Sequence, residues 1–315
     1  MESTGAQLSG MNLADKPVVL ERGRPRYGEL AIRALLAAAA IVTILTTIGI
    51  VLSLASETLS FLGEVPLTDF LFGTDWAPLF HPPSYGVIPL VVGTLQITLI
   101  GLIIAIPLGV GSAIYLNEYA QPRTRRIVKP VLEVLAGVPT VVFGFFALTA
   151  VTPFLQAIGL DVGVFNALSG GIVVGVLVIP TIASVSEDAL NAVPQGLREA
   201  SYGLGATKRQ TSVSVLVPAA LSGIIASIVL GASRAIGETM VVLIASGSRP
   251  NLTWNVLEPI QTMAAFIAAT GKGDASTGSL AYKTIFAVGA LLFLMTFLLN
   301  MFSNAMVRRF REEYE

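Results

Sequence analysis

The sequence predicts an all-α integral membrane protein with six transmembrane helices and both termini in the cytoplasm. Three observations lead to this fold class. First, 54% of the residues are hydrophobic and only 12% are charged, whereas a soluble domain carries about 25% charged residues. Second, six apolar stretches have the length or near-length of a membrane span. Third, basic residues gather in alternate connections between these stretches.

Long apolar runs predict the spans, because a spanning helix needs roughly 20 mostly apolar residues. They cover about residues 31–54, 87–115, 131–154, 170–185, 218–245 and 285–306. Pro107, Pro139 and Pro180 lie inside three of them. A proline leaves a helix carbonyl that neighbouring groups or water must satisfy. We therefore expect a bundle of kinked helices around a cavity, with the short span containing Pro180 as its least regular member.

The orientation follows from lysine and arginine in the connections. The basic residues that decide it are Arg22, Arg24, Arg26 and Arg33 before the first span, Arg123, Arg125, Arg126 and Lys129 after the second, Arg198, Lys208 and Arg209 after the fourth, and Arg308, Arg309 and Arg311 after the sixth. The connection 56–86 carries acidic residues and no basic one, so it is predicted to be an outside loop. Only the connection 247–284, with charges of both signs, departs from the alternation.

The composition also excludes several classes of function. A formal net charge of −1 gives no strong field for a nucleic acid. Without cysteine there is no disulfide, thiol nucleophile or cysteine metal site, and one histidine excludes a multi-histidine site. We expect residues 1–29 to form a polar, disordered cytoplasmic segment and residues 30–315 to form the transmembrane domain.

The connection after the fourth span has the signals of two short helices. Pro194 suits the start of a helix through Tyr202, and the following glycines, Gly203 and Gly205, suit its end and a turn. Thr207 and Gln210 then have the spacing of a capping box. We expect residues 187–217 to present a short helix to the cytoplasm, as a docking element for a groove on a partner.

The same connection resembles the EAA loop of ABC importer permeases. Glu199, Ala200, Ser201 and Gly205, followed by Val215 and the pair Val217-Pro218, have the spacing of that motif. Serine replaces its second alanine, and valines replace an isoleucine and a leucine. The resemblance implies a MetI-like permease bundle in which Glu199, Ala200, Ser201 and Gly205 couple the chain to a separate ATPase. A generic cytoplasmic loop is the competing interpretation.

The fifth predicted span contains two charges four residues apart, Arg234 and Glu238. In one continuous helix they would share a face and could pair. An intramembrane arginine costs roughly 2.5–3.5 kcal/mol on insertion scales, so its presence needs a reason. The residues alone favour two interpretations of the pair equally. It lies on a substrate pathway, or it fixes helix packing or a subunit interface. Ser227, Gly231 and Ala235 repeat every four residues and predict a close helix contact.

Three strings extend the resemblance: "YGVIPLVVGTLQIT", "AIPLGVGSAIYLNEYA" and "SRAIGETM", at residues 85–98, 105–120 and 233–240. They are similar to permeases of phosphate-specific (Pst) importers, of the PstC type. The resemblance implies inorganic phosphate as substrate, Arg234 and Glu238 on its pathway, and a location in the prokaryotic cytoplasmic membrane. Its implied partners are a second, PstA-type permease, an ATPase dimer and an extracytoplasmic phosphate-binding protein.

Other functions remain as alternatives. A permease for another oxyanion, sulfate or molybdate, would share these features. A membrane-embedded lipid-phosphate enzyme would need a cluster of Asp, His or metal-ligand residues that the sequence lacks. A free-standing ion-coupled transporter would not need the docking loop. The string "TGKGD" at 270–274 lacks the first glycine and the Ser or Thr of a phosphate-binding loop, so we expect no enzyme activity and no cofactor in this chain, with ATP bound by the partner.

Overall fold

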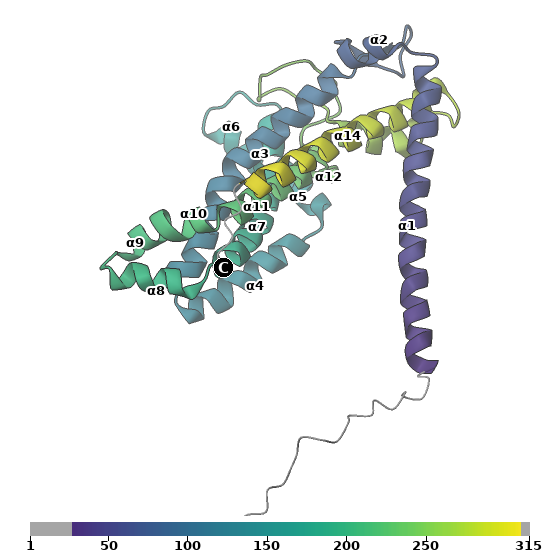
Figure 1. Cartoon of the computed structure of the whole chain (residues 1–315). Helices are drawn as coiled ribbons and strands as arrows, with labels where there is room; N and C mark the ends of the chain where they lie inside the picture. The colour runs from purple at the N-terminus through teal and green to yellow at the C-terminus, as the bar shows by residue number, and fades with distance from the viewer. Residues whose placement is uncertain (1–26, 310–315) are drawn as a thin grey trace, which may run out of the picture. The chain divides into compact units, whose positions relative to one another are not determined.

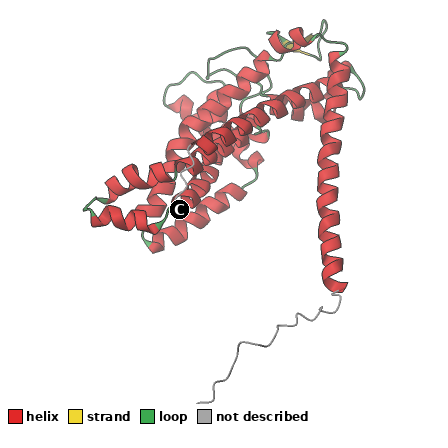
Figure 2. Ribbon diagram, in the orientation of Figure 1, coloured by secondary structure: helices red, strands yellow, loops and turns green. Residues whose placement is uncertain are grey.

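The computed structural model describes residues 27–309, which are almost entirely helical (Figure 2). The chain divides into two units, residues 1–52 and 53–315. Most of the predicted polar segment 1–29, including Arg22, Arg24 and Arg26, lies outside the described residues, as does Arg311.

The described part of the first unit belongs to helix α1 (Tyr27–Leu62), which confirms and lengthens the first predicted span. Its most apolar window has no buried residue. Hydroxyls inside it bond back to the chain, as Thr47 does to the carbonyl of Thr43 at 2.9 Å. The hydroxyls of Thr43 and Thr47 are satisfied within the helix, and the apolar side chains around them are exposed, so α1 suits an apolar solvent along this length.

The predicted outside loop is a folded cap. The end of α1 is followed by α2 (Leu67–Phe72) and by strands β1 (Trp76–Ala77) and β2 (Ser84–Tyr85), which pair antiparallel. The rings of Phe61 and Phe70 lie edge to face at 5.4 Å, and Trp76 meets Phe266 at 4.9 Å. Burial of these aromatic rings gives the cap its own core.

Two long helices form the centre of the second unit and lie side by side in Figure 1: α3 (Ile88–Ile114) and α7 (Ala167–Asn191). Glycines let their backbones approach. A Cβ on Gly175 would stand 2.8 Å from the carbonyl oxygen of Gly101, and one on Gly171 would stand 2.6 Å from Ile100. The packing therefore excludes side chains at these positions, and α7 extends beyond the predicted fourth span 170–185 at both ends.

The prediction for the third span was wrong at its beginning. Residues 122–137 form the amphipathic helix α4 (Pro122–Gly137), and the chain then turns extended at Val138 before Pro139. A residue before proline avoids the helical conformation. The apolar span starts only at Thr140 and comprises α5 (Thr140–Phe146), a π-helical turn, η2 (Ala147–Val151), and α6 (Thr152–Ala157).

The fifth predicted span, 218–245, is not continuous either. After α8 (Gln195–Gly203) come α9 (Lys208–Thr211), the π-helical turn η3 (Ser212–Leu216) and α10 (Val217–Ala219). The chain then bends by 72° into α11 (Leu221–Ile236). A second break, at residues 237–239, separates α11 from α12 (Met240–Ala245).

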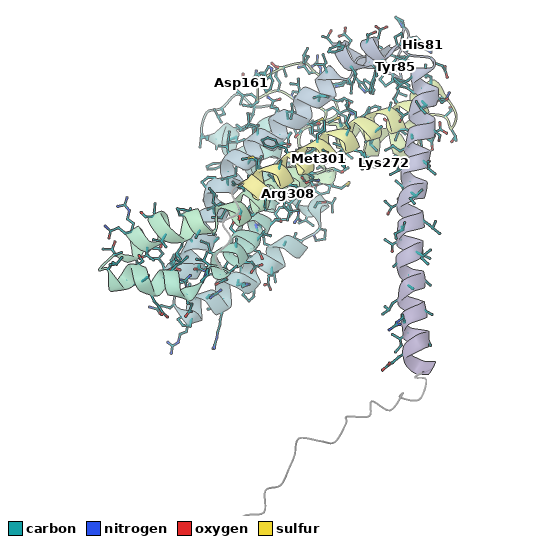
Figure 3. The ribbon with its side chains drawn as sticks, in the orientation of Figure 1. His81, Tyr85, Asp161, Lys272, Met301 and Arg308 are labelled. Carbon is teal, nitrogen blue, oxygen red and sulfur yellow. The ribbon has the colours of Figure 1, made fainter. Side chains whose placement is uncertain are left out.

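The described chain ends with α13 (Met263–Ala269), the π-helical turn η4 (Thr270–Asp274) and α14 (Leu280–Arg309). Five described helical segments are long and apolar enough to span a membrane, or six if residues 208–236 count as one bent span. The predicted number of six and the predicted orientation stay predictions. Within the second unit, α2 and the labelled His81 and Tyr85 lie at one end, and α8 and α9 lie at the other (Figures 1 and 3).

The small residues of α11 pack against α7, as their spacing predicted. Ser227 shares a hydrogen bond of 2.7 Å with Ser186, and Ala235 is buried. A Cβ on Gly231 would stand 2.8 Å from the Ile182 side chain and 2.9 Å from that of Val178. These three small residues therefore form the close contact that holds α11 on the central helix.

Replacing Gly231 with alanine is expected to destabilise the protein by about 1–3 kcal/mol, the usual cost of overpacking. The reason is the clash of the new Cβ with Ile182 and Val178. The measurement is the thermal unfolding midpoint of the purified protein in detergent. Gly111→Ala in α3 is the matched control, because nothing lies within 4 Å of its added Cβ. Equal midpoints for the two variants would contradict the tight contact.

Candidate functional site

Arg234 lies in the last turn of α11 and is half-buried. Its Nη1 donates a hydrogen bond of 2.8 Å to Oγ1 of Thr181, in the middle of α7. In the described part of the chain, no carboxylate forms an ion pair with Arg234. A guanidinium carries five donors and stays charged, so residues 27–309 leave most of its hydrogen-bonding capacity unused.

Glu238 lies in the break between α11 and α12 and is buried. Helix α11 ends at Ile236, and the amide of Gly237 bonds to the carbonyl of Ser233 at 3.2 Å. The Oε1 atom of Glu238 accepts a hydrogen bond of 3.2 Å from the backbone N–H of Val241, in the first turn of α12. A carboxylate is favourable there because the N-terminus of a helix carries partial positive charge.

The structure therefore corrects the prediction that Arg234 and Glu238 share one helical face and pair. The four-residue spacing implies pairing only if the helix continues, and it ends between them. Arg234 turns to a hydroxyl of α7, and Glu238 caps the next helix. Both remain close to one break in the fifth predicted span.

A cavity of about 240 Å³ lies between α4 and α7, beside Thr181. Its lining combines two hydroxyls with charged groups of both signs: Lys129, Glu133, Thr181, Ser184 and Glu187, among apolar residues. Thr181 lines this cavity and also accepts the hydrogen bond from Arg234, so this one residue lies between the cavity and the arginine.

The predicted coupling helix is present as α8, one residue longer than expected. Glu199 and Ala200 are exposed on it, and Leu204 just beyond its end is 91% exposed. Gly205 has a φ of +81°, the left-handed conformation that glycine adopts without strain. The turn therefore displays one acidic, one small and one large apolar side chain to the surroundings.

The rest of the loop is held by local bonds. Thr207 and Gln210 form the predicted capping box, with Thr207 N–H donating to Gln210 Oε1 at 2.9 Å and Gln210 N–H donating to Thr207 Oγ1 at 3.3 Å. Ser201, unlike Glu199, is buried and shares a hydrogen bond of 2.9 Å with Thr211. Ser201 thus fastens α8 to the following helical segment instead of facing outward.

Sequence reasoning missed a buried carboxylate near the end of α7. Glu187 is 1% exposed and forms ion pairs with Arg125 and Lys129 of α4. The apolar run stops at Val185, so the sequence predicts that Glu187 lies in the loop. In the structure α7 continues to Asn191 and includes Glu187. Lys129 forms its ion pair with Glu187 of another helix, and not with Glu133, which lies four residues further along α4.

Comparison with known proteins places the chain among membrane components of transport systems. Residues 105–312 match the family model described as "Binding-protein-dependent transport system inner membrane component". A probable ABC transporter permease protein, YqgH of Bacillus subtilis, is 35% identical over 89% of this chain and 91% of that protein. The phosphate transport system permease protein PstC 1 of Mycobacterium bovis is 34% identical over 76% of this chain and 81% of the relative. PstC of Mesorhizobium japonicum is 28% identical over 86% and 88%.

Two solved structures show the same fold at low identity. A chain of a bacterial alginate ABC transporter, bound to its periplasmic protein, superposes with a TM-score of 0.65 over 93% of this chain and all of that one, at 16% identity. A chain of the MetNI methionine ABC transporter in an inward-facing conformation superposes with a TM-score of 0.54 over 72% and 95%, at 21% identity.

Proposed function

Because this chain belongs to the family of binding-protein-dependent transport system inner membrane components, we propose that it is the PstC-type permease subunit of an ATP-driven importer of inorganic phosphate. Membership makes it a multi-pass ABC transporter permease of the inner membrane. The finer assignment includes four partners: a PstA-type permease, two ATPase subunits, and an extracytoplasmic binding protein that delivers phosphate.

The observation that carries the phosphate assignment is Arg234. It stands at the end of an apolar helix, and among the residues that the structure describes its side chain has one neutral hydrogen-bond partner, the Thr181 hydroxyl. A half-buried guanidinium without a counter-ion favours a passing anion, and its planar donors match two oxygens of a tetrahedral oxyanion. The PstC relatives support phosphate as that anion.

The four-residue spacing suggested that Glu238 pairs with Arg234, but in this proposal Glu238 has another role. Its carboxylate holds the start of α12, and thereby the short turn that follows Arg234. It is a positioning residue for the arginine's segment, and it leaves the guanidinium to the substrate. The resting arginine is held by Thr181 instead, through a bond that an oxyanion can displace.

The ATPase coupling proposed for Glu199, Ala200, Ser201 and Gly205 divides into two roles. Glu199 and Ala200 are exposed and available to a groove on the ATPase, and Gly205 shapes the turn beside Leu204. Ser201 acts from inside by bonding to Thr211. Closure of the ATPase dimer on ATP would pull on α8 and so change the access to Arg234.

The test is uptake by cells whose only phosphate importer of this type contains the chain. Deletion is expected to abolish high-affinity uptake of labelled phosphate and to leave sulfate and molybdate uptake unchanged. Restoring the gene should restore phosphate uptake alone. If deletion instead lowers sulfate or molybdate uptake, the phosphate assignment fails and the alternative oxyanion is the substrate.

A further inference from the structure

Helix α8, the proposed coupling helix, carries one arginine whose side chain contacts the rest of this chain. Arg198, in the middle of α8, has a side chain that is 24% exposed. Its Nη2 lies 2.9 Å from Oε1 of Glu118 and donates a hydrogen bond of 3.0 Å to Oδ1 of Asn117. Both partners belong to η1 (Tyr115–Tyr119), the π-helical end of α3. Arg198 thus joins α8 to one of the two central helices.

Polar contacts continue from there to the other central helix. Asn117 donates to Asn191 of α7 at 2.7 Å, and Arg125 of α4 donates to both Asn191 and Glu187. Lys129 completes the chain at 3.4 Å from Glu187. We call these seven residues the coupling network: Asn117, Glu118, Arg125, Lys129, Glu187, Asn191 and Arg198. It connects α8 with η1, α7 and α4.

Helix α7 leads from this network to the candidate pathway. Ser186, next to Glu187, bonds to Ser227 of α11 at 2.7 Å. Further along the same helix, Thr181 accepts the hydrogen bond from Arg234. One continuous helix therefore contacts the network at its end and Arg234 in its middle.

The two carboxylates of the network are buried, which makes their ion pairs costly to separate. The side chains of Glu118 and Glu187 are 5% and 2% exposed. Removing one partner of a buried ion pair leaves an uncompensated charge, which is strongly unfavourable. Arg198 therefore cannot leave Glu118 without a large penalty, and α8 cannot shift without η1 and the end of α7. Partial desolvation of the Tyr202 phenol, and then the nearby Glu118 carboxylate, raise the pKa of Tyr202, so this neighbour adds no second negative charge at neutral pH.

We propose that Arg198 is a positioning residue that ties the coupling helix to α3 and α7, so that movement of α8 alters the surroundings of Arg234. Glu199 and Leu204 meet the ATPase from the outer face, and Arg198 transmits the displacement from the inner face. This inference rests on the proposed ATP-driven function but not on the identity of the substrate.

The experiment uses the complete transporter in proteoliposomes and a single reporter cysteine. The chain has no cysteine of its own, so Ser184→Cys in the cavity beside Thr181 gives one labelling site in this subunit. The rate of maleimide labelling of that subunit is measured with and without ATP plus vanadate. We expect ATP to change this rate by at least about fivefold, the low end of typical couplings between sites. Arg198→Gln should abolish that change while the ATPase still co-purifies.

Three variants make the outcome decisive. Arg209→Gln removes an exposed arginine of the same loop and should keep the ATP-dependent change. The exchange Arg198→Glu with Glu118→Arg restores the ion pair in reverse and should recover the change, whereas Arg198→Glu alone should not. An unchanged ATP response in Arg198→Gln overturns the proposal. Loss of ATPase co-purification also overturns it, because Arg198 would then be a docking residue. Phosphate uptake by the unmodified complex tests the proposed function separately.

Discussion

Replacing Arg234 with glutamine is expected to reduce phosphate uptake by at least about 100-fold. Glutamine keeps a donor for Thr181 but loses the charge and the paired donors with which the proposed pathway would bind a tetrahedral anion. Hydrogen bonds to charged groups contribute about 1.5–3 kcal/mol each, so two of them account for a loss of this size. The measurement is the initial rate of labelled phosphate uptake in cells with equal amounts of permease in the membrane.

The control for this variant is Arg249→Gln, which removes an exposed arginine from the loop after α12. It should leave uptake within about twofold of the unmodified level, because surface changes away from such features have small effects. Co-purification of the second permease and the ATPase separates the two readings of Arg234. If Arg234→Gln prevents assembly, the arginine fixes a subunit interface and the pathway role fails.

Replacing Gly205 with valine is expected to uncouple the permease from its ATPase. The glycine has a φ of +81°, a conformation that costs an ordinary L-residue about 1–2 kcal/mol, and a β-branched residue is among the least tolerant. The turn would relax to another conformation and move Leu204 and the end of α8. We expect loss of ATPase co-purification from membranes and loss of uptake, with normal insertion of the permease.

Gly203→Ala is the matched control for this loop. It adds a methyl group two residues away, at a helical position where nothing lies within 4 Å of the new Cβ and where φ is not positive. Normal ATPase binding in Gly203→Ala and lost binding in Gly205→Val would show that the turn conformation is what the partner requires. Retained binding and uptake in Gly205→Val would contradict the coupling role of this turn.

The features that the sequence predicted well depend on signals within a few residues. The capping box of Thr207 and Gln210 needs only a spacing of three, and both of its bonds are present. The left-handed turn at Gly205 follows from its missing Cβ. Helices α1, α3, α7 and α14 follow from long apolar runs, because lipid accepts no unpaired backbone and favours continuous helix.

The corrections arose where distant residues decide the outcome. A helix can continue through a glycine such as Gly237 or end there, and the contacts of the neighbouring residues decide which occurs. Here the helix ends, and Glu238 caps α12 instead of pairing with Arg234. The length of α7 depends on Glu187, which stays in the helix because Arg125 and Lys129 neutralise it from another helix. No spacing within the chain indicates a partner 62 residues away.

The sequence by itself determined the membrane class, the approximate positions of most spans, and the short helix and capping box of the loop after the fourth span. Only the tertiary structure decided which groups the charged residues meet: Thr181 for Arg234, the start of α12 for Glu238, and Glu118 for Arg198. The physical reason is that hydropathy and capping act along the chain, over one or two helical turns. The partner of a buried charge is instead set by which helices pack together, because a charge removed from water must be compensated by whatever group lies beside it.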